Sequence, residues 1–138
     1  MTESATTGIQ LPAFGAHHNY VVAVDDDPDL RELMAMQLRR GGYEVATAHD
    51  GPSAIALIQR RPPDAVVLDV SMPGMSGIEV CRTLRTIEST VAVPIIMLTS
   101  RAQVTFEMEG RMAGADAYLT KPHTARTLLA CLEDLLLS

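Results

Sequence analysis

Five polar residues of this 138-residue chain could together bind a divalent cation and a phosphoryl group. Asp25 and Asp26 are adjacent, whereas Asp69 stands apart from other acidic residues; all three follow short apolar runs. Three carboxylates brought together would raise one another's pKa values unless a hard cation such as Mg²⁺ shared them. The ammonium of Lys121 would stabilise charge on a transferring group, and Thr99 would add a hydroxyl.

Asp69 is the best candidate for a nucleophile. An aspartate can attack phosphorus and form an acyl phosphate. Asp69 ends the run Ala65–Leu68, which is apolar and β-branched enough to be a buried central strand. The loop that follows contains Gly74 and Gly77, which let the backbone come close to a ligand. We therefore predict that any acyl phosphate forms on Asp69.

The elements that would position these residues alternate between apolar runs and segments of helical period. The predicted strands are Tyr20–Val24, Tyr43–Ala48, Ala65–Leu68, Val93–Leu98 and Ala117–Leu119. The predicted helices are Pro28–Arg40, Gly51–Arg60, Gly77–Thr86, Phe106–Ala113 and Ala125–Leu137. This alternation predicts an α/β domain in which a doubly wound parallel sheet is covered by helices on both faces.

The candidate residues follow four different strands of this predicted sheet. Ligands of open parallel sheets bind at the carboxyl ends of the strands, where these residues would meet. Each feature alone has a structural explanation, because acidic pairs cap helices, a threonine can fill a strand end and Lys-Pro can form a turn. Their joint occurrence at four strand ends favours one site for phosphate and metal chemistry.

Composition limits the classes of partner and location. The formal charge of −6 and the pI near 5.1 oppose a general nucleic-acid surface, so we expect no direct contact with nucleic acid. The chain has no long apolar run, so we expect no membrane insertion and a cytoplasmic location. Cys81 and Cys131 lie in apolar helical patterns and are expected to be reduced and unpaired.

Two segments differ in composition. Residues 1–19 are rich in Thr, Ser, Gly and Ala without sustained periodicity, which predicts a flexible leader. His17 and His18 lie in this leader, but two adjacent histidines without further ligands do not make a metal site. Residues 20–138 then have the length of a single domain.

Four motifs resemble the receiver domain of bacterial two-component response regulators over the span 20–138. VVAVDDDP, VVLDVSMPGMSG, IIMLTS and GADAYLTKP occur in that family's order. The resemblance implies a flavodoxin-like, five-stranded parallel sheet in the order 2-1-3-4-5 with five helices. It further implies a signalling switch that accepts a phosphoryl group from a sensor histidine kinase or a histidine phosphotransfer protein.

The resemblance also implies roles for the acceptor and metal residues. Asp69 would be the phosphoacceptor. Asp26 would bind Mg²⁺ directly, Asp25 would bind it largely through water, and Ser71 would offer its backbone carbonyl.

Further roles concern the switch. The hydroxyl of Thr99 would follow the phosphoryl group, Lys121 would pair with a phosphoryl oxygen, and Tyr118 would turn inward behind them. An ordinary half-buried aromatic on an edge strand explains Tyr118 equally well. Partners would read a surface formed by residues 103–113, Tyr118 and the helix from Ala125. By the same resemblance, the Lys121–Pro122 bond is expected to be cis.

The sequence departs from the family pattern at one position and varies at two others. His123 stands where the family usually has an aromatic such as Phe. This difference could alter packing or make this corner responsive to pH. A plain surface histidine is the simpler interpretation. Ser71 and Arg101 occupy positions that tune how water reaches the acyl phosphate. They influence its lifetime without giving its value.

Two alternatives stay open from the sequence. A haloacid-dehalogenase-type phosphatase also uses a strand-end Asp with Mg²⁺, but it typically has an Asp where this chain has Ser71 and carries its nucleophile on the first strand. A degenerate receiver would keep the fold as an interaction module without phosphorylation. We expect a phosphorylated stand-alone regulator or relay shuttle without separate substrate turnover, which acts on a downstream protein target. A phosphorylation-dependent homodimer is a further option.

Overall fold

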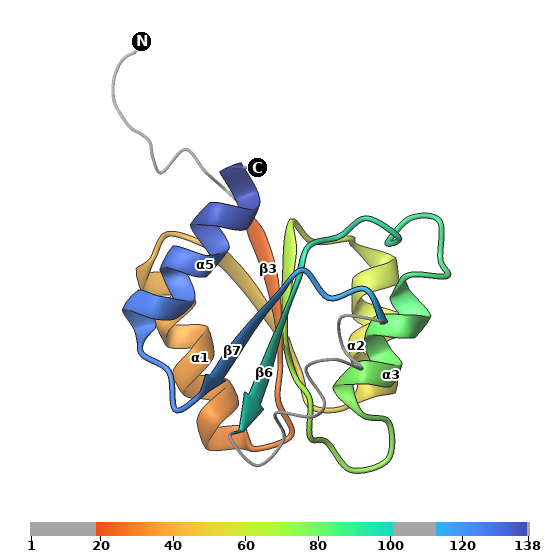
Figure 1. The fold of residues 1–138 in the computed structure, drawn as a ribbon, viewed down its shortest axis with the longest axis horizontal. Coiled ribbons are helices and arrows are strands. Elements are labelled where there is room, and N and C mark those ends of the chain that lie inside the picture. Colours follow the sequence, from red (N-terminus) through yellow and green to blue (C-terminus); the bar gives the residue numbers. More distant parts are fainter. Residues whose placement is uncertain (1–18, 101–112, 138) are drawn as a thin grey trace, which may run out of the picture.

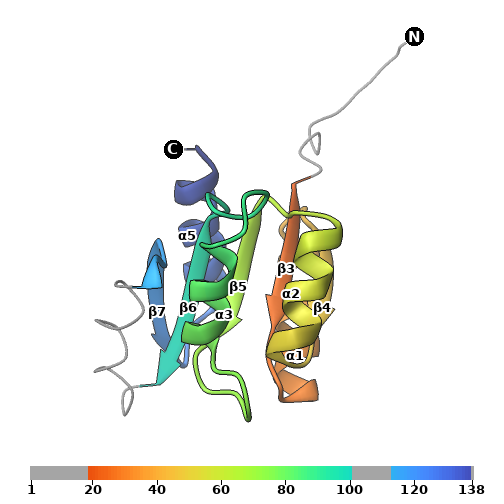
Figure 2. The ribbon, with the colours of Figure 1, turned by 90° about the vertical axis from the view of Figure 1, so that its right-hand side faces the viewer.

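The computed structural model describes residues 19–100 and 113–137, and it contains one five-stranded parallel sheet. The spatial order is β4-β3-β5-β6-β7, which is the predicted order 2-1-3-4-5 when strands are counted along the chain. Seen face-on in Figure 2, the strands run in one direction, so their carboxyl ends share one edge. The strands are β3 (Tyr20–Val24), β4 (Glu44–Ala48), β5 (Ala65–Asp69), β6 (Ile95–Ser100) and β7 (Ala117–Lys121).

Helices cover both faces of the sheet, as predicted. In Figure 1, α1 and α5 lie on one face, whereas α2 and α3 lie on the other. The described helices are α1 (Pro28–Arg40), α2 (Gly51–Arg60), α3 (Gly77–Leu84) and α5 (Ala125–Leu137). The described ranges thus contain four helices rather than five. The predicted helix Phe106–Ala113, except Ala113, and the predicted leader, except Asn19, lie outside the described residues.

The three inner strands are buried on both sides, and their side chains alternate between two core clusters. Val22 and Leu68 face α2 and α3, while Val21 and Val67 face α1 and α5. This burial explains why these strands are nearly continuous apolar runs rather than runs that alternate between apolar and polar residues. Cys81 is buried, Cys131 is partly buried, and both are free thiols, as predicted.

Several predicted boundaries are wrong by one or two residues. The strands β5, β6 and β7 continue past their apolar runs, because a parallel ladder needs backbone groups and not apolar side chains. Asp69 pairs with Leu98, and Thr99 pairs with Thr120. β6 starts after Pro94, which has no N–H to give to a ladder, and β4 starts at Glu44 rather than at the preceding tyrosine. The ladder therefore includes residues of the predicted site.

α3 is also shorter than predicted and ends at Leu84 instead of Thr86. Beyond this point the backbone bonds reach back three residues, from Thr86 N to Thr83 O and from Ile87 N to Leu84 O. Such tighter turns are common at helix ends.

Arg85 closes the end of the sheet opposite the carboxyl edge. Its guanidinium donates to the carbonyls of Val93 and Gly114, each at 2.7 Å, and to Asp116 Oδ2 at 3.0 Å. The same carboxylate oxygen accepts from the N–H of Ile95 at 2.8 Å. One side chain thus fixes where β6 and β7 begin.

No helix among the described residues is both long and apolar enough to cross a bilayer.

Candidate functional site

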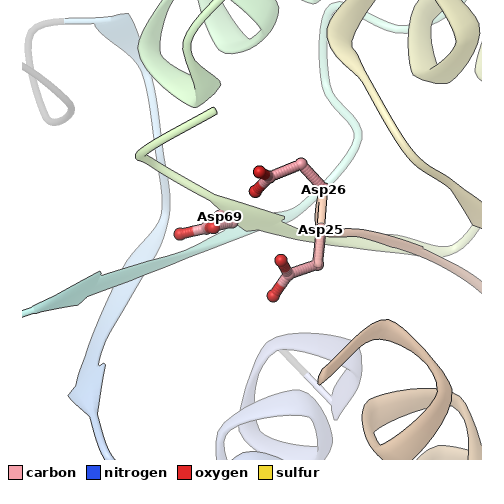
Figure 3. A group of neighbouring side chains, drawn as sticks. All are labelled: Asp25, Asp26 and Asp69. Carbon is pink, nitrogen blue, oxygen red and sulfur yellow. The ribbon is translucent and has the colours of Figure 1, made fainter. Parts of the chain in front are cut away.

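Three aspartates gather at the carboxyl edge of the sheet (Figure 3). Asp69 ends β5, and Asp25 directly follows the neighbouring strand β3, so the ladder places these two residues side by side. One carboxylate oxygen from each of Asp25, Asp26 and Asp69 lies within 4.8 Å of the others. Asp25 and Asp69 are only 2% and 3% exposed, whereas Asp26 faces solvent.

The loop between β3 and α1 holds the first acidic pair in place. The N–H of Asp27 donates to Asp25 Oδ1 at 3.0 Å, and Arg31 Nη1 donates to the Asp25 carbonyl at 3.0 Å. Asp27 in turn caps α1 by accepting from the N–H of Asp29 at 2.9 Å. The start of the helix and the placement of the acids therefore depend on the same short segment.

The loop after β5 approaches Asp69 closely through Gly77. The N–H of Gly77 donates to the Val70 carbonyl at 2.9 Å, and Ser71 N–H donates to Asp69 Oδ1 at 3.3 Å. A β-carbon at position 77 would lie 2.3 Å from the backbone oxygen of Asp69. The first residue of α3 must therefore be glycine for the chain to pass so close to Asp69.

Lys121 and Thr99 reach the same edge from β7 and β6. Lys121 Nζ lies 3.0 Å from Asp69 Oδ1 and 4.0 Å from Asp25 Oδ2. Thr99 is buried and lies one position beyond the residue that pairs with Asp69. The Lys121–Pro122 bond is cis, as expected. The ammonium, the hydroxyl and the acids thus meet at one end of the sheet.

The electrostatics of the site favour a cation. Burial raises the pKa of Asp69; Lys121 opposes this shift and Asp25 adds to it. Burial likewise raises the pKa of Asp25, although the hydrogen bond from the Asp27 N–H and the charge of Lys121 act to lower it. Within the described residues the three clustered carboxylates have one ammonium beside them, that of Lys121, which contacts Asp69 and Asp25, so negative charge is in excess. Carboxylate oxygens are the ligands that Mg²⁺ prefers, and the donor set therefore fits this ion.

Of the remaining predicted residues, the structure describes Tyr118 and Ser71. Tyr118 is partly buried on β7, pairs with Met97, packs against the core cluster beneath α2 and α3, and has a hydroxyl oxygen inaccessible to solvent. Ser71 is exposed in the loop after Asp69. Arg101 and most of the predicted partner surface, residues 103–112, lie outside the described residues.

A family comparison decides what this arrangement belongs to. The family model described as "Response regulator receiver domain" matches residues 21–133. The chain is a receiver domain. The match covers all nine described elements except the first residue of β3 and the last residues of α5, so the acidic cluster, Lys121 and Thr99 lie within the matched span.

Individual relatives agree with this assignment. The receiver is 42% identical over 116 residues to the phosphate regulon transcriptional regulatory protein PhoB of Pseudomonas aeruginosa, a match that covers 84% of this chain and 51% of that protein. The chain spans about half the length of the curated relatives it matches.

Solved structures agree as well. Chemotaxis protein CheY4 of Vibrio cholerae is similar with a TM-score of 0.81 and 37% identity, over 85% of this chain and 98% of that one. The receiver domain of the sensor histidine kinase PA1611 of P. aeruginosa, solved with a magnesium ion in its active site cleft, has a TM-score of 0.81 and 30% identity, over 87% and 98% of the two chains.

Two residues that shape the receiver site were not singled out for these contacts by sequence reasoning. Arg31 fixes the carbonyl of Asp25, and Gly77 touches the backbone of Asp69. An arginine inside a helix is common and gives no signal before the fold is known. Gly77 was expected to let the backbone approach a ligand, but its packing against Asp69 depends on the fold.

His123 is partly buried beside the receiver site and is not a plain surface residue. It lines a cavity of about 400 Å³ together with Asp25, Leu33, Leu98 and Lys121. Its Nδ1 is inaccessible to solvent and has no hydrogen-bond partner within residues 19–100 and 113–137. Burial, aided by Lys121, lowers the pKa of this imidazole. A histidine at the position where the resemblance predicts an aromatic thus buries a ring nitrogen without a hydrogen-bond partner among the described residues.

We expect His123→Phe to stabilise the receiver by about 1 kcal/mol, because it removes a buried unpaired nitrogen. The pKa of His123 in the folded state lies below the ordinary value of 6.5. The folded protein therefore has its full stability above pH 6.5, where the ring is neutral in both states, and loses stability as pH falls from 6.5 through the folded-state pKa. The variant should therefore lose less stability on acidification. Urea unfolding of both proteins on either side of that pH measures this, and an equal or greater loss in the variant would contradict it.

Mg²⁺ should stabilise the receiver more strongly as pH rises. Because the pKa values of Asp25 and Asp69 are raised above 3.8, the metal-free folded protein loses stability as pH rises from 3.8 through those raised values. Mg²⁺ would bind the ionised carboxylates, so its effect should grow over the same interval, to about 2–3 kcal/mol at a concentration about 100-fold above Kd. Thermal melting with and without Mg²⁺ at about pH 5 and about pH 7 measures this. An equal melting shift at both pH values would contradict it.

Proposed function

We propose that this receiver accepts a phosphoryl group on Asp69 from a sensor histidine kinase or a histidine phosphotransfer protein. The observation that carries the proposal is the buried Asp69 carboxylate, 3.0 Å from Lys121 Nζ and next to two further acids. Asp25, Asp26, Asp69 and the backbone carbonyl of Ser71 would hold Mg²⁺. When bound, the metal supplies charge neutralisation for the incoming phosphoryl oxygens.

The chemistry follows from the positions of the side chains. A carboxylate oxygen of Asp69 attacks phosphorus, a new O–P bond forms, and the P–N bond to the donor imidazole breaks, leaving the electron pair on that nitrogen. Lys121 is already paired with Asp69, so its ammonium is in place to pair with a phosphoryl oxygen. The Thr99 hydroxyl, on the neighbouring strand, then donates to another phosphoryl oxygen.

One comparison and one feature of the fold support this proposal. The PA1611 receiver domain is named with a magnesium ion coordinated in its cleft, and an acidic cluster suited to such an ion is present in this chain. The acidic residue on which the proposal centres ends β5, the third strand along the chain. A haloacid-dehalogenase-type phosphatase would carry its nucleophile on the first strand, so this position opposes that alternative.

We further propose that the phosphorylated receiver signals through protein contacts. Phosphorylation would draw Thr99 and Lys121 inward and bias the surface formed by Tyr118, α5 and residues 103–113, which a downstream protein or a second receiver could read. The net charge of −6 supports a signal without direct contact between this domain and nucleic acid. PhoB is named a transcriptional regulatory protein, and about half of its length lies outside the match.

Acetyl phosphate tests the proposed function without a partner protein. Incubation with acetyl phosphate and Mg²⁺ should add the mass of one phosphoryl group, the gain should vanish without Mg²⁺, and hydroxylamine should remove it because acyl phosphates are labile. Intact mass spectrometry reads each result. No gain in a protein that is folded and binds Mg²⁺ would instead establish a receiver that works as an interaction module without phosphorylation.

A further inference from the structure

Arg31 is placed against the usual preference of its segment. Its neighbours Leu30, at 44% exposure, and Glu32 are exposed, whereas Arg31 is partly buried. The other two arginines of α1, Arg39 and Arg40, are exposed. Arginine is ordinarily among the more exposed residue types and leucine among the more buried ones. A segment that exposes a leucine and draws in an arginine departs from the local rules, and such departures are typical of functional sites.

The burial of Arg31 holds the loop that carries two of the acids. Its guanidinium Nη1 donates to the carbonyl of Asp25 at 3.0 Å, and its backbone N–H donates to the carbonyl of Asp27 at 2.9 Å. One residue thus holds both ends of this three-residue loop. In the part of the chain that the structure describes, the Arg31 side chain makes no ion pair, and the Asp25 carbonyl is its one hydrogen-bond partner.

The peptide plane between Asp25 and Asp26 is therefore fixed from outside the loop. Figure 3 shows the two side chains leaving adjacent backbone positions in different directions. The Asp25 carboxylate has a hydrogen bond of its own, from the Asp27 N–H at 3.0 Å. The Asp26 carboxylate has none within residues 19–100 and 113–137, so its direction depends on the backbone. The Asp25 carbonyl and the Asp26 N–H belong to one rigid unit, so a bond to this carbonyl also orients Asp26.

We propose that Arg31 is a positioning residue for the metal site. By holding the Asp25 carbonyl, it keeps the carboxylates of Asp25 and Asp26 in the arrangement that Mg²⁺ requires. This inference rests on the proposed function, because it takes the three acids as the Mg²⁺ site. Mg²⁺ demands a nearly ideal octahedron of oxygen ligands, so a small rotation of one ligand lowers its affinity. Residues that orient metal ligands without touching the ion typically contribute about 10–100-fold in affinity.

Charge and position predict opposite effects for the loss of Arg31. The guanidinium is positive and lies 3.0 Å from the backbone of the acidic pair, so its charge repels a cation bound there. If only this charge mattered, an uncharged side chain at position 31 would strengthen Mg²⁺ binding. Loss of the hydrogen bond to the Asp25 carbonyl should instead weaken Mg²⁺ binding. The sign of the change in affinity therefore decides between the two effects.

Arg39 provides a matched control on the same helix. Its Nη2 donates to the carbonyl of Val45 at 3.2 Å, so it also ties α1 to a backbone carbonyl outside the helix. Val45 lies in β4, the edge strand, which carries none of the three acids. Replacing either arginine with methionine removes one charge and one hydrogen bond, while methionine keeps a high helix propensity. Only the change at Arg31 affects the acidic loop.

A Mg²⁺ titration followed by the NMR signals of the backbone amides gives Kd for each protein. Arg31→Met should raise Kd about 10-fold, and Arg39→Met should leave it unchanged. Arg31→Lys keeps a donor on a shorter side chain and should raise Kd by less; it carries the same test should Arg31→Met fail to fold. At saturating Mg²⁺, labelling of Arg31→Met by acetyl phosphate should recover the wild-type rate, which a general defect in folding would not allow.

Two results would overturn the inference and leave the metal site standing. One is a folded Arg31 variant that binds Mg²⁺ as tightly as the wild type or more tightly. The other is an equal rise of Kd in Arg39→Met, because the effect would then come from the stability of α1 in general. Failure of the proposed function looks different, since the wild type itself would then bind no Mg²⁺, and the role of Arg31 would fall with it.

Discussion

Replacing Asp69 with Asn should abolish phosphorylation by acetyl phosphate, with a rate loss of at least about 100-fold. The Asn amide is nearly isosteric, so the fold should persist, but it offers no carboxylate oxygen to attack phosphorus. Asp69 is also the acid that Lys121 contacts directly, at 3.0 Å. Intact mass spectrometry with Mg²⁺ present gives the extent of labelling.

The matched control for this variant is Asp27→Asn. Asp27 is an exposed acid beside the same cluster and could accept a phosphoryl group if reactivity depended on exposure alone. Its structural role is to cap α1, and Asn caps helices as well as Asp does. Asp27→Asn should therefore keep its labelling. Labelling that survived in Asp69→Asn but disappeared in Asp27→Asn would place the acceptor outside β5.

Gly77→Ala should lower the free energy of unfolding by about 3 kcal/mol. The new methyl group would lie 2.3 Å from the backbone oxygen of Asp69 and 3.0 Å from the Cα of Val70. Both contacts are with backbone, so relief requires β5 or α3 to move. The movement would displace Asp69 itself, and we expect labelling by acetyl phosphate to fall together with stability.

Gly51 provides a matched comparison, because it is also the first residue of a helix. A β-carbon there would lie 2.8 Å from the Cβ, Cγ and Sδ of Met75. The Cγ and Sδ can rotate away, whereas relief of the Cβ contact needs a small shift of the loop that carries Met75. We expect Gly51→Ala to cost less than Gly77→Ala, because no strand backbone has to move and alanine also favours the helix. Urea unfolding of both variants measures the difference, and equal losses would contradict the backbone explanation.

The sequence predicted the elements best where local signals mark both ends. The predicted bounds of β3, α1, α2 and α5 are those observed. α1 has a capping aspartate before it, a proline at its first position and glycine after it, so short-range chemistry fixes its ends. The ends of β6 and β7 are polar, and only their strand neighbours show that Thr99 and Lys121 belong to the ladder.

The residue types of the candidate site were also predictable, but the close packing of the segments around it was not. Strand ends that carry Asp25, Asp69 and Lys121 converge in any sheet of this order. The close approach of Gly77 to Asp69, and the buried nitrogen of His123, depend on distances between segments remote in sequence. Side-chain identity alone contains no such distances.

Arg85 and the acidic cluster lie at opposite ends of the sheet, and this has a consequence for building larger molecules from the domain. The backbone enters β3 at Tyr20 and leaves α5 at Leu137, both at the Arg85 end (Figure 2). A five-residue strand, about 17 Å long, separates that end from Asp69. Fluorescent proteins, surface tethers or other modules joined directly before Tyr20 or after Leu137 would thus attach on the far side, leaving the acidic cluster open to a docking donor.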